Sequence, residues 1–101
     1  MKLIMSTCPA KEADGLAEKL LEEKLVACVN IITGLVSKYW WKGKIETDQE
    51  SLLLMKTTPS LTGKVIERIR ELHSYDVPEV IVCNIEQGNP DYLEWIGEVT
   101  G

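Results

Sequence analysis

Residues 27–57 constrain the fold more than any other part of the chain. They form two apolar, β-branched runs that meet at Gly43, a pattern that predicts one long β-hairpin. A first strand over residues 26–41 would extend roughly 50 Å at about 3.3 Å per residue. A domain of 101 residues has a radius of gyration of only about 13 Å. The hairpin is therefore longer than the body that carries it.

Strands of this length must bend or project into solvent. Thr33 and Gly34 mark the place for a bend, because glycine permits a bulge or kink. A projecting end would carry Tyr39, Trp40 and Trp41 beside unpaired strand edges. Soluble monomers avoid such surfaces, since they promote association. We therefore expect a homo-oligomer assembled through these arms.

Composition narrows the class of protein. With 101 residues, of which 45% are hydrophobic, we expect one domain over residues 1–101. The net charge of -5 argues against nucleic acid and anionic membranes as partners. No apolar run has the length of a membrane span or a signal peptide, so we expect a cytoplasmic protein. The three cysteines form no C-x-x-C pair and are expected to be reduced thiols.

The remaining elements follow from periodicity and turn residues. We expect strands at residues 2–7 and 79–85, and helices at residues 10–24, 60–72 and 91–99. The order β-α-β-β-α-β-α predicts the α+β class: a ferredoxin-like βαββαβ fold with an antiparallel sheet and a C-terminal helix. This topology places Cys8 and His73 at one end of the sheet, and Cys28 and Lys56 at the other.

Several ordered motifs resemble one known family. They are ACVNI at residues 27–31, S-x-Y-x-W-x-G-K at 37–44, LLLMKT at 52–57, LHSY at 72–75, PEVI at 78–81 and G-x-x-x-Y-L-x-W-I at 88–96. Together they are similar to the CutA divalent-cation tolerance family over nearly the whole chain. The resemblance implies a ferredoxin-like subunit in a compact homotrimer, with long hairpins pairing across subunits. It also implies a link to copper and other divalent metals, and no catalytic reaction.

The chain departs from this family at places that matter for metal binding. Copper-binding relatives can carry a cysteine at the position of Ser6, and two histidines where this chain has Leu72 and His73. Two ligands that the resemblance implies are therefore absent. Cys8 follows Ser6 by two residues and so lies on the same strand face, which makes it a candidate replacement. Thr33 and Ser74 stand where the family often has proline.

Cys8 and His73 are the candidate metal ligands. A thiolate and an imidazole at a common sheet end suit copper or Zn²⁺, and neighbouring chains or Tyr75, Asp76 and Glu79 would have to complete the site. In another interpretation His73 complements the C-terminal end of a helix and Cys8 fills the core. A third gives Cys8 a lowered pKa, because it precedes a helix. Cys28 and Cys83 are expected to pack as small apolar residues.

Glu46, Asp48 and Glu50 alternate along the second hairpin strand and project to one side. Such a row can attract a hard divalent cation, but it is also typical of a solvated strand face, and we adopt the second interpretation. Lys38, Lys42 and Lys44 lie across the hairpin as candidate partners for these acids.

Aromatic residues indicate where copies of the chain meet. The anchors are Tyr39, Trp40, Trp41, Tyr92 and Trp95, and aromatic residues are favoured at interface centres. The sequence contains no hydrolase, phosphate-loop or H-E-x-x-H motif, so we expect neither an enzyme nor an obligatory cofactor. The leading hypothesis is a homotrimer that binds divalent metal such as copper and contributes to metal tolerance. The alternative is a PII-like trimeric small-molecule sensor or interaction scaffold.

Overall fold

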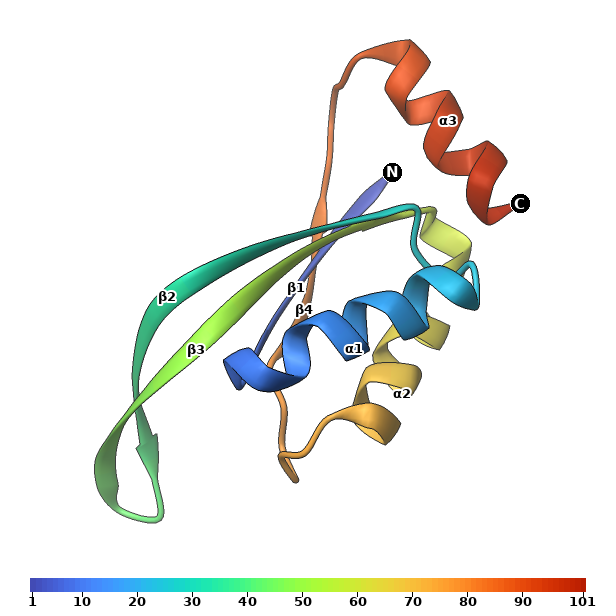
Figure 1. The fold of residues 1–101 in the computed structure, drawn as a ribbon. Coiled ribbons are helices and arrows are strands. Elements are labelled where there is room, and N and C mark those ends of the chain that lie inside the picture. The colour runs from blue at the N-terminus through green and yellow to red at the C-terminus, as the bar shows by residue number, and fades with distance from the viewer.

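The computed structural model describes residues 1–101 and contains four strands and three α-helices (Figure 1). In chain order they are β1 (Lys2–Cys8), α1 (Ala10–Glu22), β2 (Cys28–Trp41), β3 (Lys44–Thr57), α2 (Thr62–Leu72), β4 (Val80–Asn84) and α3 (Pro90–Thr100). A single turn of 3₁₀ helix, Pro59–Leu61, leads into α2. The predicted order of elements is confirmed, and the predicted bounds differ by a few residues at most.

The four strands form one antiparallel sheet in the order β2-β3-β1-β4. This is the strand order of the split β-α-β arrangement, so the α+β, ferredoxin-like prediction is confirmed. Strands β1 and β2 run in one direction because each pairs antiparallel with β3. The two edges of the sheet are the long strand β2 and the short strand β4.

The long hairpin bends where the sequence predicts. Pairing of β2 with β3 is regular up to Ile32 and resumes at Leu35, which leaves a bulge between them. Gly34 lies in this bulge with φ +75°, a conformation that glycine adopts without steric cost. At the tip, Lys42 and Gly43 have φ 49° and 79°. Two successive positive φ values are those of a type I′ turn, whose twist matches the twist of the flanking strands.

The hairpin gives the subunit an elongated shape. Strands β2 and β3 have 14 residues each, and the molecule measures 44 × 25 × 22 Å. In Figure 1 the distal half of the hairpin curves away from the helices and extends beyond the rest of the body. The radius of gyration is 14.1 Å, above the roughly 13 Å of a compact domain of this length.

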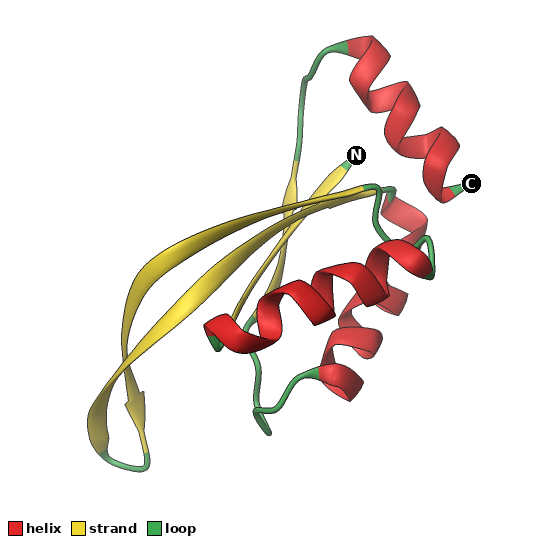
Figure 2. Cartoon of the chain, in the orientation of Figure 1, coloured by secondary structure: helices red, strands yellow, loops and turns green.

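The core lies between one face of the sheet and helices α1 and α2 (Figure 2). Helix α1 forms because small and apolar residues recur on one side, and these are the residues that are buried: Ala13, Leu16, Ala17 and Leu20. The helix ends at Glu22, before Lys24 adopts φ 57°. The ten residues of the core cluster are Ile4, Cys8, Ala13, Leu16, Leu20, Val26, Leu53, Met55, Val65 and Ile69.

The other face of the sheet is only partly covered. Leu3, Met5, Leu52 and Leu54 alternate with the core residues and remain partly exposed. Helix α3 begins at Pro90, where the side chain of Asn89 accepts a hydrogen bond from the Asp91 backbone N–H at 3.2 Å, and it extends beyond the end of the sheet (Figure 1). None of the helices is long and apolar enough to cross a membrane.

Candidate functional site

A cavity of about 760 Å³ lies between the distal half of the hairpin and the loop that joins α2 to β4. Residues 37–41 and Glu50 form the hairpin side, residues 74–79 form the loop side, and Thr7 at the end of β1 contributes as well. The cavity therefore brings together three of the candidate interface residues and three acids, which are Tyr39, Trp40, Trp41, Glu50, Asp76 and Glu79. The hairpin and the loop lie at the same end of the sheet because β3 and β4, which follows the loop, both pair antiparallel with β1.

His73 fastens this loop to the sheet. Its Nε2 lies 2.7 Å from the carbonyl oxygen of Thr7, and its Nδ1 accepts a hydrogen bond from the backbone N–H of Tyr75 at 3.0 Å. Because Nδ1 accepts, Nε2 carries the proton and donates to Thr7. The side chain is 8% exposed. Within one subunit, both nitrogens of His73 are thus used in hydrogen bonds, and neither is free to bind a metal.

Cys8 lies at the same end of the sheet, as the topology predicts. It is fully buried in the core, opposite Ser51 of β3. Burial raises the pKa of the Cys8 thiol to about 11, and the nearby carboxylates of Glu12 and Glu50 act in the same direction. The interpretation of Cys8 as a helix-activated thiolate is therefore wrong, because loss of solvation and the two negative charges outweigh the helix terminus.

The acidic row of β3 is not a uniformly solvated face. Glu46 is exposed and Asp48 is partly exposed, but Glu50 is only 4% exposed. The hydroxyl of Tyr75 donates a hydrogen bond to Glu50 Oε2 at 3.0 Å. Burial, followed by this hydrogen bond to the carboxylate, raises the pKa of Tyr75 well above its usual value. The solvated interpretation holds for Glu46 and is wrong for Glu50.

The lysines of the hairpin do not pair with this acidic row. Lys38 Nζ donates to the Thr47 hydroxyl at 3.1 Å, and Lys42 Nζ lies 5.9 Å from the centre of the Trp41 ring. The three ion pairs of the structure are instead Arg68–Glu23, Arg68–Glu71 and Arg70–Glu67. The row Glu46, Asp48 and Glu50 therefore carries its negative charge without a basic partner in the subunit.

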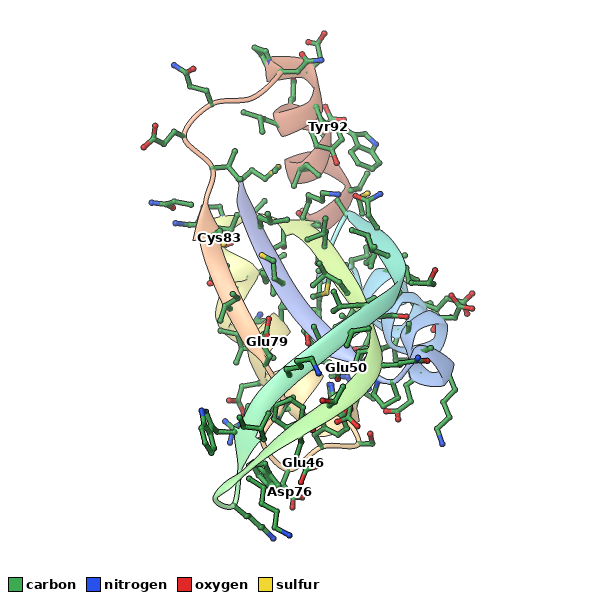
Figure 3. All side chains as sticks on the ribbon, turned by 90° about the vertical axis from the view of Figure 1, so that its left-hand side faces the viewer. Glu46, Glu50, Asp76, Glu79, Cys83 and Tyr92 are labelled. Atoms are coloured by element: carbon green, nitrogen blue, oxygen red, sulfur yellow. The ribbon has the colours of Figure 1, made fainter.

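The predicted aromatic anchors are all solvent-accessible in the subunit. Trp40 is 72% exposed, and the other exposed fractions are 44% for Trp41, 41% for Trp95, 38% for Tyr39 and 36% for Tyr92. Tyr39 donates a hydrogen bond to Asp48, which raises the pKa of Tyr39 to about 12. Tyr92 and Trp95 stack on each other in α3 with ring centres 5.8 Å apart. The two groups lie at opposite ends of the molecule, which Figure 3 shows for Tyr92 relative to Glu46.

A metal centre is not formed by a single subunit. No three side chains among the histidine, cysteines and carboxylates lie close enough to hold an ion together. Cys8 and His73 are neighbours in the fold, but the first is a buried thiol with a raised pKa and the second has both nitrogens occupied. The assignment of Cys8 and His73 as ligands stays a prediction.

The chain is similar to proteins of one family along nearly its whole length. The model of the CutA1 divalent ion tolerance protein family matches residues 2–99. The chain belongs to the CutA1 divalent ion tolerance family. The divalent-cation tolerance protein CutA of Thermus thermophilus is 46% identical over 101 residues, which is 99% of this chain and 98% of that protein.

Other CutA relatives differ in length and in the compartment that their names state. The rice protein CutA 1, chloroplastic, is 48% identical over 97% of this chain, but the chain spans only 56% of that relative. The structure of the periplasmic divalent cation tolerance protein CutA from Archaeoglobus fulgidus superposes with a TM-score of 0.96 at 38% identity, and each chain is covered completely. The CutA fold is thus shared along the whole chain, while the compartment varies among relatives.

Sequence reasoning missed the buried Glu50 and its contact with Tyr75. Alternating charges along a strand indicate exposure, and nothing local distinguishes Glu50 from Glu46. In the sheet Glu50 lies opposite Leu35, where pairing resumes after the bulge. Tyr75 reaches it from the loop after α2, a contact that no pattern within the strand indicates.

Proposed function

We propose that this chain is a cytoplasmic divalent-cation tolerance protein that assembles into a homotrimer and binds a divalent metal such as copper. The observation that carries the proposal is the match of the CutA1 family across residues 2–99. It is supported by a bacterial relative of nearly the same length that is named for divalent-cation tolerance. The protein acts by binding, without an obligatory cofactor or a catalysed reaction.

Assembly is supported by the surface of the hairpin. Trp40 and Ile45 face each other across the two strands and are 72% and 62% exposed. Ile32 and Val36 precede Trp40 on β2 and are 47% and 56% exposed. The outer edge of this strand is unpaired. Apolar strands with a free edge pair readily with another chain. A neighbouring copy would cover both the apolar surface and the free hydrogen-bonding groups.

Sedimentation velocity of the untagged protein at micromolar concentration tests the assembly. We expect one species with three times the mass of the 11.4 kDa chain. A stable single subunit under these conditions would contradict the proposal.

Metal binding needs contributions from more than one subunit or a change at His73. The imidazole must release either Thr7 or Tyr75 before a nitrogen can reach a metal. The thiol of Cys8 must lose a proton that burial holds tightly, and soft thiolate ligands favour copper. Ligand exchange of this kind predicts modest affinity that increases with pH, because metal and proton compete for the Cys8 sulfur.

Calorimetric titration with Cu²⁺ tests this part of the proposal, using freshly reduced protein freed of reductant. We expect Cys8→Ser and His73→Gln each to lower the affinity, and Cys83→Ser, at a partly exposed cysteine, to leave it unchanged. Equal affinity and stoichiometry in all four proteins would remove Cys8 and His73 from the metal site.

The cavity favours a second candidate function, a trimeric small-molecule sensor or interaction scaffold. Its volume of about 760 Å³ lies within the range of roughly 300–1,000 Å³ that is usual for ligand pockets. Native mass spectrometry of freshly purified protein tests this function, combined with elemental analysis. A bound organic molecule without retained metal would favour the sensor, and retained metal alone would favour the first function.

A further inference from the structure

Glu50 is a buried carboxylate without a counter-ion. It is 4% exposed, and its only hydrogen bond is the one that it accepts through Oε2 from Tyr75 at 3.0 Å. None of the three ion pairs of the subunit includes it. A buried charge is costly unless a partner of opposite sign and further hydrogen bonds compensate it. No basic group of the subunit therefore lies within ion-pair distance of Glu50.

The second oxygen of Glu50 has no hydrogen-bond partner in the subunit, and Glu50 lines the cavity. Oε1 accepts no hydrogen bond, yet the only fully buried side-chain polar atom without a partner is Ser51 Oγ. Oε1 is consequently accessible, and Glu50 lines the cavity. The free oxygen is therefore positioned to accept a hydrogen bond from a molecule that enters there.

The charged residues around the cavity also favour a positively charged ligand. Its lining contains the carboxylates of Glu50, Asp76 and Glu79 and a single ammonium, that of Lys38. Figure 3 shows these three acids in the half of the molecule that carries the hairpin end. Such a concave, acidic surface concentrates cations.

The residues that line the cavity favour an organic cation over a metal ion. Tyr39 and Tyr75 line the cavity, and aromatic faces attract ammonium and guanidinium groups while covering the apolar part of a ligand. A metal ion would need several oxygen or nitrogen ligands in a small space, and no group of three is present. The volume of about 760 Å³ exceeds what a bare ion requires.

We propose that this cavity binds a small organic cation, a primary ammonium or an amidinium-like group on an apolar body, with Glu50 as its counter-ion. The cationic group donates hydrogen bonds to Oε1, and the aromatic side chains pack against the apolar body. The inference rests on the small-molecule function proposed second above and names the class of its ligand.

A matched pair of probes tests the charge requirement on the unmodified protein. Benzamidine is cationic at neutral pH, and benzamide has nearly the same shape without the charge. Calorimetry and tryptophan fluorescence, in buffer with a chelator, should show saturable binding of benzamidine and none of benzamide up to about 10 mM. Trp40 and Trp41 line the cavity and supply the fluorescence signal.

A pair of variants tests the role of Glu50. Glu50→Gln removes the charge and keeps the shape, and should weaken benzamidine about tenfold or more, as loss of a hydrogen bond to a charged group predicts. Glu46→Gln removes a charge from the same strand outside the cavity lining and should leave the affinity unchanged.

Each outcome decides between the proposals. Equal binding of benzamide and benzamidine would overturn the cationic ligand and preserve a small-molecule site. Absence of binding by both would overturn the cationic ligand, whereas the small-molecule function is decided separately by the native mass spectrometry described above. Unchanged affinity in Glu50→Gln would overturn the assignment of Glu50 as counter-ion. None of these results depends on whether Cu²⁺ binds elsewhere.

Discussion

At the scale of single residues, the site contains two acidic groups in unfavourable surroundings. Glu50 is a carboxylate without a cation, and Cys8 is a thiol held in its neutral form by burial and by nearby carboxylates. Ser51, opposite Cys8, has a buried hydroxyl without a hydrogen-bond partner. Strain of this kind at one location is typical of sites kept for function at some loss of stability.

Glu50→Gln is expected to stabilise the ligand-free protein. Glutamine keeps an acceptor for the hydroxyl of Tyr75 and removes a buried charge that has no counter-ion. The gain should be about 1 kcal/mol or more, seen as a higher denaturation midpoint in calorimetry. Glu46→Gln, at an exposed position of the same strand, should change the midpoint little. A lower midpoint for Glu50→Gln would show that a cation already compensates Glu50 in the assembled protein.

Cys8 is expected to make stability depend on pH in the alkaline range. Its pKa is raised from 9.0 to about 11 in the folded chain, so the unfolded chain releases this proton first. The stabilisation is complete below about pH 9 and is lost as the pH rises towards 11. Denaturant unfolding at several pH values, compared between the protein and Cys8→Ala, should show a steeper fall for the unsubstituted protein. Parallel curves would contradict the raised pKa.

Iodoacetamide labelling gives an independent check of the same thiol. Cys28 and Cys83 are partly exposed, whereas Cys8 is fully buried. After labelling of the native protein at pH 8, mass spectrometry should therefore find Cys28 or Cys83 labelled before Cys8, because alkylation requires an accessible thiolate. Early labelling of Cys8 would mean that the core opens locally.

At the scale of elements, the bulge at Gly34 sets the direction of the distal half of the β2–β3 hairpin. Gly34 has φ +75°, and a Cβ atom placed there would meet nothing within 4 Å. The cost of Gly34→Ala is therefore conformational, about 1–2 kcal/mol, and should appear in chemical denaturation. Gly15→Ala is the matched control, since Gly15 lies in α1 with equally open space. That change should stabilise the protein by up to about 1 kcal/mol, so a loss at both positions would contradict the argument.

Local sequence patterns predicted the elements well because each pattern has a local cause. Glycine at residues 34 and 43 fixes the bulge and the turn, and the helical periodicity of residues 10–24 yields α1, although it ends at Glu22. The environment of Glu50 has no local cause, since Tyr75 reaches it from a loop that follows α2. Which of the three interpretations of Cys8 applies had no local signal either, because its raised pKa comes from burial in the core and from carboxylates of α1 and β3. Tertiary proximity of this kind is not encoded in the spacing of one segment.

At the scale of the whole molecule, the arm presents an apolar surface that the subunit does not cover. Replacing the exposed cross-strand pair, Trp40→Thr with Ile45→Thr, should shift the sedimentation profile towards smaller species, because apolar burial drives association. Leu21→Gln, at a residue of α1 that is 39% exposed, should leave the profile unchanged. An unaltered profile for the hairpin variant would place the subunit contacts elsewhere.

The hairpin packs on the core only near its base, where Val29 and Ile31 contact the core cluster; no residue from 33 to 52 belongs to the cluster or is among the apolar residues packed against it. None of the ten residues of the core cluster lies between Val26 and Leu53. Substitutions along the exposed part of the hairpin therefore leave the interior of the subunit largely unaffected, and in the proposed assembly they alter the contact with a neighbouring copy instead. Under that proposal, two related chains in one cell can keep their assemblies from mixing by divergence in this segment alone, because discrimination depends on the difference between the affinities for like and unlike neighbours.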